Sequence, residues 1–384
     1  MKNTNKLLSS ALCLLLICGC TDSSGGTNDS TINDPEITGK ITISAAPEYS
    51  AALSKVADRI ERNSPGLEIS FTDDSADIII TDRLPENAVQ NCMPLNSAAE
   101  KIGSTVIPEL TIKNGDDIIG LPLFLKIESY WFDRLYYQAN SREIPFSLTA
   151  VKASLKSNEH CAAFSPSSAE SFFWSTAAPY YIKAGGTAEE LSNADFNSEK
   201  LQKALENASQ LFKHGIVSAD TSAGELFLSE QLMFYIADIS KISAERHNFP
   251  LNSDISLAPS LIFNDNCSTL AVRSAFVTVR KSADKDLVNK FLAELYSNEI
   301  LLNIIKSSEI PLACRISYDN NSVPALTAGV NSVLSSPDVG IHYINCRWNE
   351  TITAAVTEAV NGIADGNLSA AQAASHILSA VKAP

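Results

Sequence analysis

The sequence predicts an α/β fold built on mostly parallel sheets. Residues 37–44 (ITGKITIS) have the β-branched content of a strand, and residues 67–71 have it again. Between them lies a segment whose apolar side chains follow the three-then-four spacing of a helix with one buried face. Strand, helix and strand in this order are typical of two parallel strands joined by a crossover helix.

The first elements can be bounded from local signals. The helix buries Leu53, Val56 and Ile60 and stops near Pro65, because proline disfavours helical geometry in the residue before it. Residues 76–81 (ADIIIT) form a third strand, and its unbroken isoleucine run indicates burial on both faces.

The remainder of the chain alternates in the same way. Further strands are predicted at 118–125, 161–164, 255–258 and 275–279. Helices are predicted at 147–157, 169–183, 198–214 and 352–363, at 374–381, and as two consecutive helices within 285–306.

Composition limits the possible functions. The chain has 384 residues, enough for two domains, and its 44 acidic and 29 basic residues give a net charge of −15. Nucleic-acid binding requires a basic face, so we expect no nucleic-acid partner. The five histidines are scattered, and neither a Gly-x-Ser-x-Gly elbow nor a phosphate loop is present. We therefore expect no enzyme activity, no metal and no cofactor.

The first 37 residues predict export and anchoring. Lys2 and Lys6 precede an apolar run over 7–18, which is typical of a secretory signal peptide and is too short to span a bilayer. The step I-C-G-C resembles the bacterial lipoprotein signal, so residues 1–19 would be removed and Cys20 lipidated. Residues 20–37 would then form a flexible linker holding the protein at the outer face of the cell membrane. The alternatives are an uncleaved anchor and an ordinary signal peptide.

The cysteines beyond Cys20 leave two possibilities open. They are widely separated and follow no zinc or redox spacing. Cys314 and Cys346 are a candidate disulfide pair if the protein is exported into an oxidising compartment. Otherwise all of them are buried thiols, which is the interpretation that we favour.

Several strings in order resemble the extracellular solute-binding proteins of bacterial ABC importers, in the sugar-binding group that includes maltose-binding protein. They are NSPGLEIS, ADIIITDR, GLPLFLKIESYWFDRLYY, SAFVTVRKSADKDLVNKFL and RWNETITAAVTEAV. The resemblance implies two α/β lobes with a ligand cleft between them, formed by 38–123 plus 263–310 and by 124–262 plus 311–384. It also implies a monomer that delivers a mono- or oligosaccharide to an ABC permease. The alternative is a lipoprotein of the same fold that serves a sensor or binds a non-sugar solute.

Polar candidates for the binding site come from strand ends. Asp82 and Arg83 follow the isoleucine-rich strand at its carboxyl edge, where ligands bind in α/β folds. Their carboxylate and guanidinium suit sugar hydroxyls, although they could instead form a loop-capping salt bridge. Glu48 and Tyr49 lie on the first strand-to-helix turn, which lines the cleft in the resembled family. Asp238 stands where the maltose-binding branch has a tryptophan, so maltodextrin specificity is doubtful.

Aromatic candidates would supply stacking surfaces for a sugar ring. Trp348 resembles the stacking tryptophan of the maltose-binding branch, and Phe173 and Trp174 lie where the family has an aromatic ligand contact. Tyr130 and Trp131 follow the crossover, and strand alternation sends them to opposite faces. For each of these residues, core packing is the alternative.

Overall fold

The computed structural model describes residues 38–382, apart from 73–74, 86, 145–148, 151–152, 154, 156–159, 220–222, 249–252 and 259–267. These residues belong to one compact unit, Ile37–Pro384. The signal peptide, Cys20 and the linker expected over 20–37 lie outside the described residues. None of the described helices combines the length and the hydrophobicity needed to cross a bilayer.

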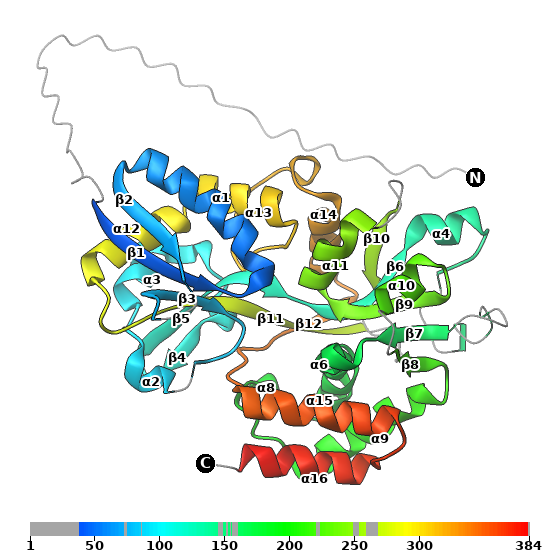
Figure 1. Ribbon diagram of the computed structural model, residues 1–384. Helices are drawn as coiled ribbons and strands as arrows, with labels where there is room; N and C mark the ends of the chain where they lie inside the picture. Colours follow the sequence, from blue (N-terminus) through cyan, green and yellow to red (C-terminus); the bar gives the residue numbers. More distant parts are fainter. Residues whose placement is uncertain are drawn as a thin grey trace, which may run out of the picture. The chain divides into compact units, whose positions relative to one another are not determined.

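The first sheet has seven strands, and the late strand β11 lies between two early strands, β3 and β5 (Figure 1). The order is β2-β1-β3-β11-β5-β4, and β12 also pairs with β11. Its members are β1 (Thr38–Ala45), β2 (Gly66–Phe71), β3 (Ile78–Thr81), β4 (Ile112–Asn114), β5 (Asp117–Lys126), β11 (Ser268–Val279) and β12 (Val339–Tyr343).

The second sheet has five strands in the order β10-β6-β9-β7-β8. They are β6 (Glu128–Asp133), β7 (His160–Phe164), β8 (Ile216–Ser218), β9 (Leu232–Asp238) and β10 (Ile255–Ala258). Only Ile127 separates β5 of the first sheet from β6 of the second, so the chain crosses directly from one sheet to the other.

Strand pairing corrects one part of the prediction. The parallel pairs β1–β2 and β1–β3 are present, as the strand-helix-strand order indicated. However, β11 is antiparallel to β3 and β5, and β6 is antiparallel to β9 and β10. The sheets are therefore mixed rather than mostly parallel. The antiparallel strands β6 and β11 are not joined to their neighbours by the crossover helix that the prediction assumed. Local periodicity does not encode strand direction, so the sequence could not show this difference.

Helices around the first sheet include the predicted amphipathic helix and the predicted consecutive pair. They are α1 (Pro47–Asn63), α2 (Ala88–Asn91), α3 (Asn96–Ile102), α12 (Lys285–Leu295) and α13 (Asn298–Ser308), with short 3₁₀ turns at Gly103–Thr105 and Pro108–Leu110. Leu53, Val56 and Ile60 are buried on α1, as the three-then-four spacing predicted. Helix α1 packs against α13, and α12 packs against α3.

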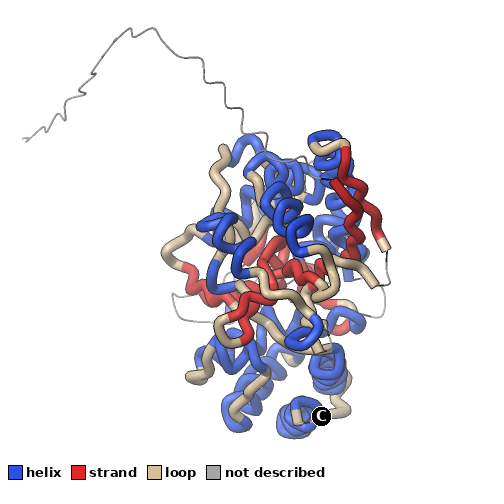
Figure 2. Tube along the Cα trace, turned by 90° about the vertical axis from the view of Figure 1, so that its left-hand side faces the viewer, coloured by secondary structure: helices blue, strands red, loops and turns tan. Residues whose placement is uncertain are grey.

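Helices also cover both faces of the second sheet. Helices α9, α15 and α16 lie against one another on one side (Figure 1), and α16 is seen end-on beside the C-terminus in Figure 2. Helices α10, α11 and α14 pack against β9 and β10. The helices are α4 (Arg134–Ala139), α6 (Ala169–Phe172), α7 (Ala178–Lys183), α8 (Ala188–Asn193), α9 (Ser198–Phe212), α10 (Ala223–Leu228), α11 (Ile239–Glu245), α14 (Ala325–Leu334), α15 (Glu350–Ala364) and α16 (Ala370–Val381).

Alternation along the strands divides the core. On β6, Tyr130 and Phe132 face a cluster with α9, α15 and α16, whereas Trp131 faces the larger cluster that continues into the first sheet. A turn of π-helix at Phe173–Ala177 interrupts the aromatic helix predicted over 169–183.

The described cysteines Cys92, Cys161, Cys314 and Cys346 are buried thiols, so Cys314 and Cys346 do not form the disulfide considered above.

Candidate functional site

A cavity of about 520 Å³ lies where elements of the two sheets meet. Its lining comes from the start of α1, the loop after β3, the crossing between β5 and β6, the start of α6, and α11. The residues are Pro47, Glu48, Arg83, Lys126, Glu128, Ser167, Ser168, Glu170, Ser171, Asp238, Ser240, Lys241 and Ala244. This volume is within the range of small-molecule pockets, and the cavity lies at the junction of the two sheets.

Three of the predicted polar residues line this cavity: Glu48, Arg83 and Asp238. Asp82 forms an ion pair with Lys126, which also lines it. Arg83 lies 3.8 Å from the exposed carboxylate of Glu350, at the start of α15. The carboxyl edge of β3 therefore brings Arg83 to the cavity and Asp82 to the lining residue Lys126.

The predicted aromatic contacts are corrected by the structure. Trp348, Trp174 and Phe173 are at most 1% exposed, and they form one buried cluster in which the two tryptophan rings lie 4.6 Å apart. The Trp348 indole N–H donates to the backbone carbonyl of Leu191 at 2.7 Å. An aromatic side chain at the start of a helix can face either way, and the apolar surroundings of Trp348 turn it into the core.

The remaining aromatic candidates are also core residues. Tyr49 is 1% exposed and stacks on Phe124 with ring centroids 4.4 Å apart. Trp131 donates its indole N–H to the Ala237 carbonyl at 2.9 Å, and the Tyr130 hydroxyl lies 2.6 Å from the Thr176 hydroxyl. Strand alternation does send Tyr130 and Trp131 to opposite faces, but helices cover both of those faces.

Charged residues that sequence reasoning missed form the inner wall of the cavity, which consists of the lining residues Lys126, Glu128 and Glu170 and of Arg273 directly behind them. Arg273, on β11, is 2% exposed; it pairs with Glu128 and lies 3.0 Å from Glu170. Its guanidinium also lies 4.3 Å above the Trp174 ring, whose indole N–H donates to Glu170 at 2.8 Å. A signal for these residues existed, because an arginine within the apolar run of a central strand must find a buried partner.

Burial and neighbouring charges shift the pKa values of two carboxyl groups, Asp82 and Glu128, in opposite directions. Burial disfavours the charged form of Asp82, but Lys126 and Arg273 outweigh it and hold the pKa of Asp82 well below its ordinary value. Burial raises the pKa of Glu128 to about 7, against the lowering effect of Arg273, and the negative charge of Asp238 adds to the increase. Near neutral pH, the inner wall can therefore take up or release a proton at Glu128.

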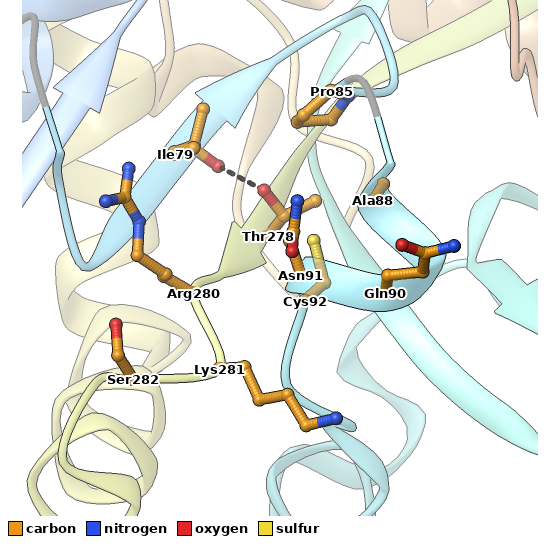
Figure 3. A pocket seen from close by; sticks show the side chains of 10 residues that line it. All are labelled: Ile79, Pro85, Ala88, Gln90, Asn91, Cys92, Thr278, Arg280, Lys281 and Ser282. Carbon is orange, nitrogen blue, oxygen red and sulfur yellow. Dashed lines mark hydrogen bonds between the residues drawn. The ribbon is translucent and has the colours of Figure 1, made fainter.

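A second cavity of about 550 Å³ is lined by residues of β3, β11 and α2 (Figure 3). Its lining includes Thr278 on β11, Asn91 at the end of α2, and the pair Arg280 and Lys281. Figure 3 shows the guanidinium of Arg280 and the ammonium of Lys281 pointing to opposite sides. The two cations therefore do not converge on one ligand. This cavity is not the candidate site, and its residues serve as controls for the variants proposed below.

Comparison with known proteins supports the fold. No family model and no curated protein matches the sequence. Among solved structures, a probable secreted solute-binding lipoprotein from Streptomyces coelicolor matches with a TM-score of 0.69 and 13% identity over 90% of this chain and 99% of that chain. A family 1 extracellular solute-binding protein from Bifidobacterium longum subsp. infantis matches with a TM-score of 0.68 and 14% identity over 89% and 98%.

A third solved structure is the maltose/maltodextrin-binding domain from Bdellovibrio bacteriovorus bound to maltotriose. It matches with a TM-score of 0.66 and 12% identity over 90% of this chain and 99% of that chain. The two-lobed α/β fold expected from the sequence resemblance is thus confirmed. This chain has the fold of these binding proteins.

The packing of Trp348 gives a first testable prediction. Replacing Trp348 with alanine should lower the free energy of unfolding by about 3–5 kcal/mol, because it removes a fully buried ring and leaves a cavity. Urea denaturation of the purified variant measures this loss, and Trp348→Phe should retain part of the stability. A Trp348→Ala variant as stable as the wild type would contradict the core assignment.

The raised pKa of Glu128 gives a second prediction, on the pH dependence of stability. The folded protein holds the Glu128 proton more tightly than the unfolded chain does. The stabilising contribution of this group is therefore complete below the unfolded pKa near 4.3 and is lost as pH rises toward about 7. The stability of wild type relative to Glu128→Gln should fall across this window in urea titrations. Glu100→Gln, an exposed position on α3, controls for loss of one carboxylate, and parallel wild-type and Glu128→Gln profiles would refute the assignment.

Proposed function

We propose that this chain is the solute-binding component of an ABC importer and that it captures a small carbohydrate in the cavity between its two lobes. The observation that carries the proposal is a cavity lined by polar and charged side chains of both lobes, in the fold of solute-binding proteins. A solute that contacts both lobes stabilises the arrangement in which they are closed around it.

The chemistry of the lining favours a small, hydroxyl-rich solute. Glu48 and Arg83 offer charged hydrogen-bonding groups from the first lobe, and Ser167, Ser171 and Lys241 offer donors from the second. Charge-assisted hydrogen bonds to hydroxyls are among the stronger polar contacts. No aromatic side chain is among the described residues that line the cavity, so these residues offer no stacking surface for a long oligosaccharide. A mono- or disaccharide therefore fits better than a maltodextrin.

The proposal includes the cell-envelope setting expected from the sequence. Cys20 carries the lipid anchor, residues 20–37 form the linker, and the protein works as a monomer at the outer face of the cell membrane. Its partners are the solute and the permease subunits that receive it. Its role is binding without catalysis, and the solved structures with this fold are described as receptors, binding proteins or transport proteins.

The binding site is tested by measuring thermal unfolding of the purified protein against neutral mono- and oligosaccharides, amino sugars, amino acids and polyamines. A ligand present at about one hundred times its Kd adds about 2.7 kcal/mol to the stability of the folded state, which appears as a clear rise in Tm. For the ligand found, Glu48→Ala and Arg83→Ala should each weaken binding about tenfold or more, as expected for the loss of a charged hydrogen bond.

The matched control for these variants is Lys281→Ala. Lys281 lines the other cavity (Figure 3), so its removal should leave the affinity for the same ligand unchanged. An affinity that depends on Lys281, but on neither Glu48 nor Arg83, would move the site away from the lobe interface and refute the proposal as stated.

The anchor is tested separately in a bacterial host. The wild-type chain should partition with membranes and incorporate labelled fatty acid, because thioether-linked lipid on Cys20 would hold it there. Cys20→Ser should abolish the labelling and release the protein from the membrane fraction, whereas Cys13→Ser should leave both unchanged. Labelling that persists in the Cys20→Ser variant would assign the anchor to another residue.

A further inference from the structure

Carboxylates outnumber cations in and directly behind the lining of the cavity. The carboxylates are Glu48, Glu128, Glu170 and Asp238 in the lining and Asp82 behind it, and the cations are Arg83, Lys126 and Lys241 in the lining and Arg273 behind it. The two cations that act on Glu128 are already engaged, Lys126 by Asp82 and Arg273 by Glu128 and Glu170. With every group ionised, the cavity region therefore has an excess of negative charge.

Two of these carboxylates are direct neighbours across the sheet. Glu128 on β6 and Asp238 on β9 are paired residues of an antiparallel ladder, so their side chains lie on the same face. Both line the cavity. Like charges in this position repel each other, and the pair is destabilising unless a cation or a proton comes between them.

The hydrogen bonds of this pair are incomplete. Asp238 caps α11 through one oxygen, which accepts from the backbone N–H of Ser240 at 2.8 Å. Its second oxygen, and the oxygen of Glu128 that does not face Arg273, are shielded from water and have no hydrogen-bond partner among the described residues. A buried acceptor without a donor is costly, so a donor placed beside either carboxylate would stabilise it.

A hydrogen-bond donor that carries positive charge would satisfy both the free acceptors and the excess charge of this pair. A metal ion is disfavoured, because no group of three or more metal-ligating side chains occurs in the part of the chain that the structure describes. An ammonium group needs only acceptors and one or two carboxylates beside it. We propose that the solute carries a protonated amino group, as an amino sugar does, and that this group binds beside Glu128 and Asp238.

This inference rests on the proposed function and narrows its substrate class. It also predicts a proton linkage. Glu128 faces Arg273 from β11, Asp238 from β9, Lys126 from β5 and Glu170 from α6. Since burial raises its pKa to about 7, Glu128 is partly protonated near neutral pH. A bound ammonium favours the carboxylate form, so binding should release a proton and tighten as pH rises from 5.5 to 7.0.

The test is isothermal titration calorimetry of the full chain with matched ligands. The probes are glucosamine, galactosamine and mannosamine, each beside its neutral parent sugar and its N-acetyl derivative, together with putrescine as an amine without hydroxyls. At least one amino sugar should bind tenfold or more tightly than its neutral and N-acetylated counterparts. Measuring between pH 5.5 and 7.0 keeps an ordinary amine largely protonated.

Variants then assign the preference to the carboxylate pair. Asp238→Asn keeps a good helix cap and Glu128→Gln keeps the side-chain size, so both should fold. Each should reduce the preference for the amino sugar over the neutral sugar at least fivefold, and Glu128→Gln should also abolish the proton release. Glu100→Gln, on α3, should change neither. Thermal unfolding of each variant confirms that the protein used is folded.

The outcomes separate this inference from the function on which it rests. A neutral sugar that binds as tightly as its amino analogue, or a preference unaltered in both variants, overturns the amine inference and leaves the sugar-binding proposal standing. Binding of putrescine without any sugar keeps the amine inference and removes the carbohydrate. A panel in which no probe binds contradicts both.

Discussion

The buried ion pairs of Arg273 hold the two halves of this fold in register. Arg273 belongs to β11 in the first sheet, whereas Glu128 opens β6 in the second sheet and Glu170 lies on α6. Removing one partner from a fully buried pair leaves an uncompensated charge, at a cost of about 3–5 kcal/mol. The chain must therefore bring these three residues together, and in doing so it sets the inner wall of the cavity.

The aromatic cluster behind that wall depends on the same arginine. Trp174 lies under the Arg273 guanidinium and donates to Glu170, while its ring packs against Trp348. The tryptophans thus act as a rigid backing for the charged groups and make no part of the cavity lining. Because charged groups rather than these aromatic rings line the cavity, the cavity is suited to polar contacts.

Charge separation inside the cavity follows from a few local features. The ion pair with Lys126 keeps Asp82 ionised, and Glu170 is held by Arg273 and the Trp174 N–H. Glu128 and Asp238 instead lie opposite each other on β6 and β9, where their negative charges repel. Their proximity is the feature from which we infer a solute with a positive charge rather than one with neutral hydroxyls alone.

The sequence by itself determined the elements and their class. Isoleucine-rich strands and the spacing of Leu53, Val56 and Ile60 were sufficient for an α/β fold, because these signals depend on local periodicity. The two lobes were implied by the resemblance of several strings, in order, to a known family. The strand-end position also brought Asp82 and Arg83 correctly to the edge of the sheet.

Only the tertiary structure decided the strand directions, the faces of the aromatic residues and the membership of the cavity. Sequence alone does not show whether an aromatic side chain stacks on a ligand or fills a core. Trp348, Trp174 and Tyr49 are core residues because elements distant in the sequence pack over them. Likewise, the pairing of Arg273 with Glu128 spans 145 residues of chain, and contacts of that range are set by strand register, which local patterns do not encode.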